Sequence, residues 1–244
     1  MKKSILGALA PTLAAVAITS MPAISHADLA FNVGAVSDYR YRGISQTRLK
    51  PAVQGGVDYS NGGFYLGTWA STIKWIKDAG GDADVEVDIY GGYKFELAKG
   101  TTLDVGVLTY QYPSNKLATS ANTTEVYAGL TFGIFTAKYS HGVTNLFGFT
   151  DSKSSGYLDL SAAVDLGDGM TLTPHVGYQK VANNGTYSYT DYSLTFAKDI
   201  KGLIVSAALV GTDTKKPGGV PAYVSPAGKN LGKATVVLGV KYNF

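Results

Sequence analysis

Charged side chains recur at every second position near the start of the chain, where Asp38, Arg40 and Arg42 share one face of an extended segment. Each guanidinium presents a planar fork of N–H donors that matches a carboxylate or a phosphate. Two such groups beside one carboxylate could therefore bind or steer anionic solutes. The three residues could equally pair with acids on neighbouring strands and only stiffen the structure, and the sequence leaves both interpretations open.

A similar alternation in residues 85–97 separates an apolar face from one that carries four ionisable groups. Four such groups on one face cannot be packed into a dry core at tolerable cost, so this face should line a wet interior. Acids outnumber bases there, which favours cations, whereas the arginine pair favours anions. The candidate lumen and selectivity residues are Asp38, Arg40, Arg42, Glu86, Asp88, Lys94, Asp104, Glu125, Lys138 and Lys241.

Catalytic and metal chemistry have little support in the sequence. A serine hydrolase needs a histidine base with an orienting partner, and residues 28–244 contain only His141 and His175, far apart in the chain. The chain has no cysteine, and no paired glycines precede a predicted helix as a phosphate loop requires. We therefore expect no enzyme activity, no metal and no cofactor.

The candidate residues lie on strands that alternate with period two, and most of these strands approach the roughly 9–11 residues that cross a bilayer at a tilt. Twelve strands are predicted, at residues 29–39, 51–60, 63–71, 85–97, 101–112, 123–132, 135–140, 156–166, 171–180, 191–197, 203–211 and 233–244.

The predicted connections alternate strictly between short segments that contain glycine and long polar segments. This sorting predicts an all-β fold, a transmembrane antiparallel up-and-down β-barrel of about 12 strands with short periplasmic turns and long extracellular loops. A soluble sandwich would have no reason to sort its loops in this way. Twelve tilted strands would leave an opening of at most about 10 Å.

Residues 1–27 have the basic start, the apolar stretch and the small-x-small site of a cleaved secretory signal peptide. Residues 28–244 would then form the barrel, located in the cell outer membrane. Without Lys2 and Lys3, 19 of the 21 basic residues remain against 18 acidic ones, so no nucleic-acid partner is expected.

The last segment is similar to the assembly signal of bacterial outer-membrane proteins, because apolar or aromatic residues alternate up to a final phenylalanine. The residues on this face are Val236, Leu238, Val240, Tyr242 and Phe244. The expected partners are outer-membrane lipid and lipopolysaccharide, the barrel-assembly machinery and small hydrophilic solutes.

Aromatic residues near both ends of the predicted strands suggest two belts at the membrane interfaces. The alternative is that tyrosine is simply a favourable strand residue. The belt expected at the long-loop ends comprises Tyr39, Trp69, Tyr110, Tyr112, Tyr139 and Tyr178.

Three N-terminal blocks, residues 37–47, 51–56 and 67–71, resemble the signature of the TorF-type porin family of proteobacterial outer-membrane proteins, also known as Gcw_chp. The later segments 86–93 and 125–127 are similar to further blocks of that family. The resemblance implies a porin-like barrel and supplies neither a substrate nor a catalytic residue.

Two functions follow from these observations. The leading hypothesis is a porin for passive diffusion of small hydrophilic solutes through a narrow polar lumen. The alternative is a non-conducting barrel that acts as a structural, receptor or envelope-integrity protein through its extracellular loops. We expect the difference to depend on whether a long loop, such as residues 141–155 or 212–232, folds inward and blocks the bore.

Overall fold

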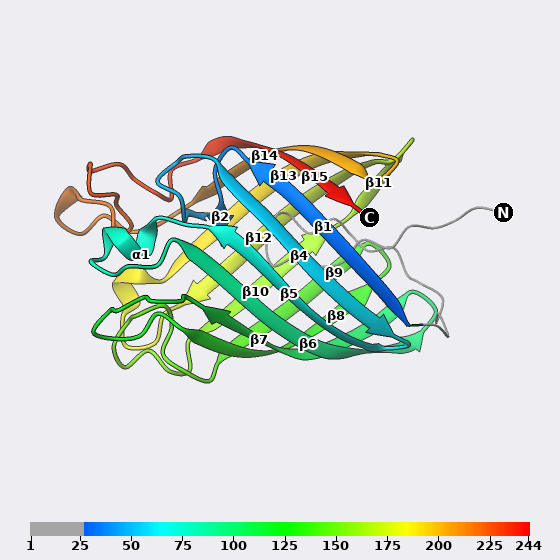
Figure 1. Ribbon diagram of the computed structural model, residues 1–244, viewed down its shortest axis with the longest axis horizontal. Coiled ribbons are helices and arrows are strands. Elements are labelled where there is room, and N and C mark those ends of the chain that lie inside the picture. Colours follow the sequence, from blue (N-terminus) through cyan, green and yellow to red (C-terminus); the bar gives the residue numbers. More distant parts are fainter. Residues whose placement is uncertain (1–26) are drawn as a thin grey trace.

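The computed structural model describes residues 27–244, so the predicted signal peptide lies outside the described residues except for Ala27. These residues form an antiparallel barrel that closes where the first long strand pairs with the last (Figure 1). The strands of the barrel wall are β1 (Asp28–Val36), β4 (Ala52–Asn61), β5 (Phe64–Thr72), β6 (Val85–Ala98), β7 (Thr101–Gln111), β8 (Thr123–Phe132), β9 (Phe135–Gly142), β10 (Gly156–Ala162), β11 (Val164–Gly167), β12 (Met170–Lys180), β13 (Tyr189–Ile200), β14 (Leu203–Thr212) and β15 (Thr235–Asn243).

β10 and β11 are consecutive pieces of one wall strand, because both pair with β12 and only Ala163 separates them. The barrel therefore has 12 wall strands, and the predicted fold class is confirmed. Every neighbouring pair is antiparallel, and the strands follow one another around the wall in chain order. Within residues 27–244, no helix is both long enough and apolar enough to cross a membrane.

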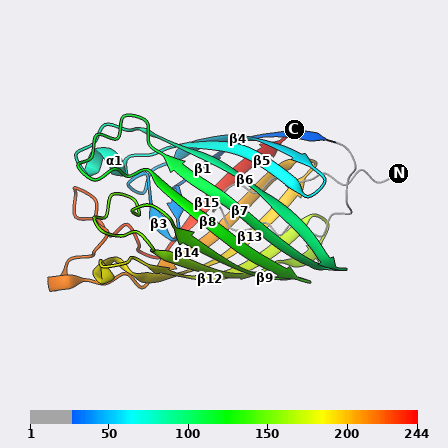
Figure 2. The ribbon, with the colours of Figure 1, turned by 90° about the horizontal axis from the view of Figure 1, so that it is seen from below.

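The connections are sorted by length between the two ends of the barrel, as the sequence predicts (Figures 1 and 2). At one end, here called the tight-turn end, β13 and β14 are joined by Lys201 and Gly202, whose φ angles of 55° and 93° fit a two-residue type I′ turn. The opposite end, here called the long-loop end, carries α1 (Trp75–Asp78), η1 (Gly185–Tyr187) and η2 (Pro217–Gly219).

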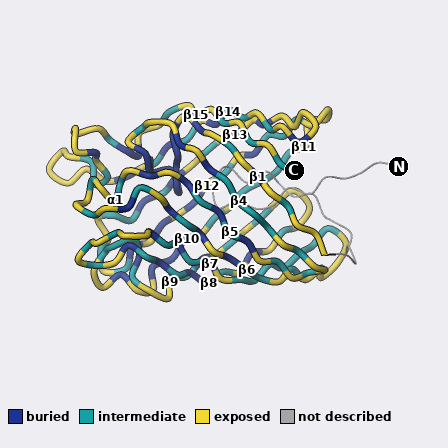
Figure 3. The backbone as a smooth tube through the Cα atoms, in the orientation of Figure 1, coloured by how far each residue is buried: buried dark blue, intermediate teal, exposed yellow. Residues whose placement is uncertain are grey.

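Exposed and buried residues alternate along the wall strands (Figure 3). On β6, Val85 and Ile89 are exposed on the outside, whereas Glu86 and Asp88 are buried on the inside. The terminal strand places the five residues of the predicted assembly signal on the exposed outer face. An apolar outer surface of this kind is stable where lipid, and not water, surrounds the barrel.

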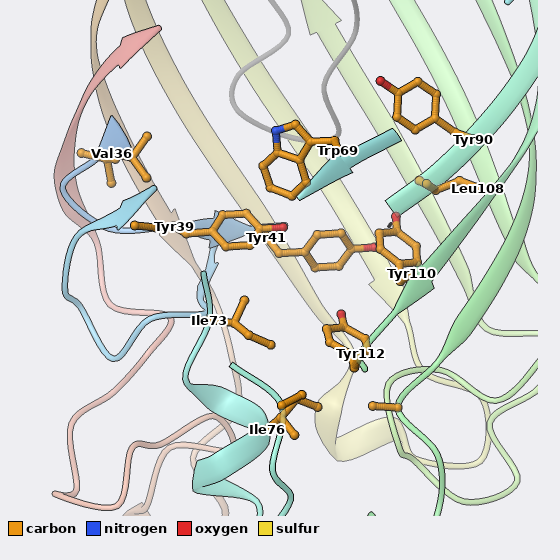
Figure 4. Packing of buried hydrophobic residues seen from close by; sticks show 14 residues of the cluster. Val36, Tyr39, Tyr41, Trp69, Ile73, Ile76, Tyr90, Leu108, Tyr110 and Tyr112 are labelled. Atoms are coloured by element: carbon orange, nitrogen blue, oxygen red, sulfur yellow. Dashed lines mark hydrogen bonds between the residues drawn. The ribbon is translucent and has the colours of Figure 1, made fainter. Parts of the chain in front are cut away.

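The predicted aromatic belt at the long-loop end is wrong for four of its members. Tyr39, Trp69, Tyr110 and Tyr112 are at most 3% exposed and pack against one another inside the barrel (Figure 4). Their position near the strand ends suggested a belt, but on β5 and β7 the parity of Trp69 and Tyr110 points inward. Large rings therefore fill the lumen at the long-loop end and do not mark an interface with lipid there.

Inner-face tyrosines lie directly over glycines of neighbouring strands. A Cβ atom added to Gly106 would lie 2.5 Å from the Tyr127 hydroxyl oxygen, and one added to Gly92 would lie at the same distance from that of Tyr65. These glycines are required for space, because any side chain there would displace a ring from the wall.

We expect Gly106→Ala to destabilise the barrel by about 1–3 kcal/mol, because the added methyl overpacks the wall beneath Tyr127. Gly185→Ala is the matched control, since its Cβ would meet nothing within 4 Å. The urea midpoint of the folded, heat-modifiable band on SDS gels measures the difference. Equal midpoints for the two variants would show that the contact has no energetic weight.

Candidate functional site

The first long connection does not stay at the rim but folds into the barrel as a short hairpin. Its strands are β2 (Arg40–Tyr41) and β3 (Ile44–Ser45), joined by Arg42 and Gly43 at φ angles of 44° and 81°. Two central residues with positive φ make a type I′ turn, which suits a tight hairpin. Residues 37–47 are called the inner hairpin below. The strand predicted at 29–39 thus ends at Val36, where the chain turns inward.

The base of the inner hairpin is fixed by Asp38 and Arg40. The Asp38 carboxylate accepts hydrogen bonds from Arg40 Nε at 2.5 Å and from Ser45 Oγ at 2.6 Å. Arg40 Nη1 donates to the main-chain oxygens of Gly43 at 2.9 Å and of Leu231 at 2.8 Å. Arg40 therefore holds the hairpin together and ties it to the segment before β15.

The tip of the inner hairpin reaches the far side of the barrel through Arg42. Its Nη1 and Nη2 donate to the two carboxylate oxygens of Glu125 at 3.0 and 2.7 Å, and Nη1 also donates to Gln179 at 2.6 Å. The guanidinium lies 4.1 Å from the centre of the Tyr157 ring. These partners belong to β8, β10 and β12, which are far from β1 in the strand order. The inner hairpin therefore crosses the lumen.

Tyrosine hydroxyls connect the inner hairpin to the side of the barrel that β6 and β7 form. Tyr39 and Tyr112 donate from their hydroxyls to the two carboxylate oxygens of Glu86 at 2.5 and 2.7 Å. Tyr41 donates to the Tyr110 hydroxyl at 2.9 Å (Figure 4). The side chains on both faces of residues 38–42 are buried, because the barrel wall surrounds the hairpin.

Other long loops also contribute contacts to this layer. Phe147 packs edge-on against the rings of Tyr41 and Tyr110, with centroids 5.1 Å apart in both pairs. The main-chain oxygen of Leu231 accepts from the Ser45 amide at 3.0 Å. The loops named as candidates to fold inward, at 141–155 and 212–232, thus supply contacts, while the segment that crosses the lumen is the first loop.

Asp88 differs from the other acids around the inner hairpin in its hydrogen bonding. It is 0% exposed, and within residues 27–244 neither of its carboxylate oxygens has a hydrogen-bond partner. Its inward neighbour on β6, Glu86, is satisfied by two tyrosine hydroxyls, and Glu125 is satisfied by Arg42. Three wall carboxyl groups, those of Glu86, Asp88 and Glu125, thus lie around the inner hairpin, and the Arg42 guanidinium pairs with one of them.

The other four candidates, Lys94, Asp104, Lys138 and Lys241, lie nearer the tight-turn end and are only half-buried. Lys94 Nζ lies 5.3 Å from the centre of the Tyr65 ring, and Lys138 Nζ lies 3.7 Å from that of Tyr127. Asp104 accepts a hydrogen bond from the Tyr65 hydroxyl at 2.6 Å. The structure therefore divides the ten candidates into an upper layer around the inner hairpin and a lower layer, here called the lower lumen.

Several further polar residues share these layers, although the candidate set drawn from the sequence did not include them. On the wall opposite β1, His175 Nε2 lies 3.1 Å from Asp159, and the Tyr157 hydroxyl donates to Asp191 at 3.0 Å. All four side chains have the inward parity of their strands, which is the signal that would have found them. In the described part of the chain, no cluster of His, Asp and Glu has the arrangement of a metal site.

The fold is similar to that of solved porins. One is described as a KdgM porin in complex with disordered oligogalacturonate, with a TM-score of 0.56 at 9% identity, covering 90% of this chain and 99% of that one. Another is a NanC porin, with a TM-score of 0.56 at 13% identity, covering 88% and 99%. No match to the sequence is found among curated proteins.

Family membership rests on the sequence itself. A sequence profile named Gcw_chp, described as a bacterial protein of unknown function, matches residues 21–244. The match spans the whole barrel, including the inner hairpin and both layers of candidate residues. The chain therefore belongs to the Gcw_chp family.

Proposed function

We propose that this protein is an outer-membrane porin that lets small hydrophilic solutes diffuse through a polar lumen narrowed by the inner hairpin. The observation that carries the proposal is a closed barrel with exposed apolar side chains outside and ionisable side chains inside. Its likeness in fold to solved porins and its resemblance to the TorF-type porins support the same proposal. Diffusion through such a lumen requires no catalytic group.

The cellular setting belongs to the same proposal. Residues 1–27 direct export and are cleaved, the tight turns face the periplasm, and the long loops face the outside, where they meet lipopolysaccharide. The barrel-assembly machinery recognises the terminal strand through the outward face that runs from Val236 to Phe244. The exposed apolar residues of the wall contact outer-membrane lipid.

A second candidate function, a non-conducting barrel that acts through its loops, is favoured by one observation. The inner hairpin crosses the lumen and is fixed on both sides, at Glu86 and at Glu125. A hairpin that never moves would leave no wide path for solutes.

Single-channel recording in planar bilayers tests both functions. The samples are refolded residues 28–244 and a hairpin-shortened variant in which Gly-Gly replaces residues 40–45. The replacement fits the backbone, because the Gln46 amide already donates to the Tyr39 oxygen at 2.7 Å. Current steps from the unaltered protein support the porin proposal. Steps from the variant alone indicate a barrel closed by its hairpin, and no steps from either folded sample would contradict the porin proposal.

A further inference from the structure

The lower lumen contains three ammonium groups that no carboxylate of the described residues binds. Lys94 on β6, Lys138 on β9 and Lys241 on β15 all have the inward parity of their strands. Within residues 27–244, none of the three forms an ion pair. A half-buried ammonium without an acceptor is costly, and an incoming anion would relieve that cost.

The lack of ion pairs does not come from a lack of acids nearby. Lys94 lies opposite Asp104 in the register of β6 and β7, and Lys138 lies opposite Asp159 in that of β9 and β10. Both ammonium groups instead lie over tyrosine rings, at 5.3 and 3.7 Å. A cation held by the face of a ring keeps N–H donors free on its other side.

The acids of the lower lumen are held by the wall. Asp58 accepts from the Tyr90 hydroxyl at 2.5 Å, Asp104 accepts from Tyr65 at 2.6 Å, and Asp159 lies 3.1 Å from His175. The formal charges of these three acids and the three lysines balance, so the free hydrogen-bonding groups decide which ion is bound. The free groups include the N–H donors of the three lysines, together with one unpartnered carboxylate oxygen of Asp58.

We infer that the lower lumen binds small anions, inorganic or carboxylate-bearing, through Lys94, Lys138 and Lys241, and that the channel prefers anions over cations. The inference rests on the proposed porin function and names its class of solute. Rings of basic side chains select anions in other pores. Most acids on the inner face do not oppose this, because tyrosine, histidine or arginine donors occupy at least one of their carboxylate oxygens. Asp88, which has no such donor within residues 27–244, is fully buried beside the inner hairpin.

The first test is the reversal potential of single channels under a tenfold KCl gradient. We expect the sign of an anion-selective channel, and we expect Lys94→Gln/Lys138→Gln/Lys241→Gln to move the potential to zero or to the cationic sign. A matched triple variant, Lys153→Gln/Lys216→Gln/Lys229→Gln, removes the same charge from exposed loop positions and should leave the potential unchanged. A cationic potential in the unaltered protein, or equal potentials in the two triple variants, would overturn the inference.

A binding measurement keeps this inference separate from conduction. Lysines are reductively methylated with ¹³C, which preserves their charge, and the protein is titrated with sodium phosphate and, separately, with sodium acetate. The signals that disappear in the Lys94/Lys138/Lys241 triple variant should shift, and those of the loop lysines should not. Shifts without any current would contradict the porin function alone. The absence of shifts with both anions would contradict the anion site.

Discussion

The single-channel conductance is expected to rise several-fold when Gly-Gly replaces residues 40–45. The inner hairpin crosses the lumen from β1 to the wall formed by β8, β10 and β12, so the change removes the segment that spans the lumen at the long-loop end. The same change removes Arg40 and Arg42, which fix the hairpin at its base and tip. The barrel itself should persist, since the main chain of β2 and β3 forms a ladder only within the inner hairpin and not with a wall strand.

The control for this prediction is a deletion of residues 217–219 in another long loop. That segment is exposed and makes no contact with the inner hairpin, so its loss should leave the conductance unchanged. Heat-modifiable mobility on SDS gels shows whether each variant is folded. Equal conductance of the folded hairpin variant and the unaltered protein would mean that the hairpin does not limit the current.

The architecture could be predicted from the sequence because lipid imposes a simple rule on it. With lipid outside and water inside, every wall residue faces one environment or the other, and the pattern of β6 shows this directly. Residues 203–211 follow this pattern less clearly, because they are apolar at most positions. Leu203, Val205 and Leu209 are their exposed outer residues, and the small Ala208 is buried inside.

The inner hairpin could not be predicted in the same way, because the protein surrounds it on every side. Alternation from Asp38 to Arg42 reads as a continued wall strand, yet both faces of that segment are buried. Alternation of side chains at every second position does not separate an inner from an outer face where both faces of a segment contact protein. The usable signal was the glycine after Arg42, which permits the positive φ angles of a two-residue turn.

The preference for one sign of charge was also beyond the sequence. Counting acids and bases on the inner face treats every charge as free, whereas Glu86, Asp104 and Glu125 each accept hydrogen bonds from residues distant in the chain. Which charges remain free depends on the register of the strands and on the path of one loop. Both are properties of the closed barrel.

Arg42→Ala is expected to reproduce much of the conductance gain without removing any backbone. Arg42 and Glu125 are 4% and 2% exposed, and breaking a buried pair by removing one partner costs about 3–5 kcal/mol. An isolated two-stranded hairpin is at best marginally stable, so the inner hairpin cannot absorb this cost in place. When the hairpin tip withdraws, lumen water reaches Glu125. The loss of the ion pair is then observed as a higher conductance.

The matched control is Arg48→Ala, in the same connection as Arg42. This change breaks a pair with Asp78 of α1 in which the arginine is 44% exposed, and it should leave the current unchanged. Glu125→Ala should widen the channel as Arg42→Ala does, because it strands the guanidinium. The conductance of the double variant should differ little from that of either single variant, since both changes remove the same Arg42–Glu125 ion pair. If Arg42→Ala conducts like the unaltered protein while the hairpin-shortened variant conducts more, Arg40 and Tyr39 hold the inner hairpin without help from its tip.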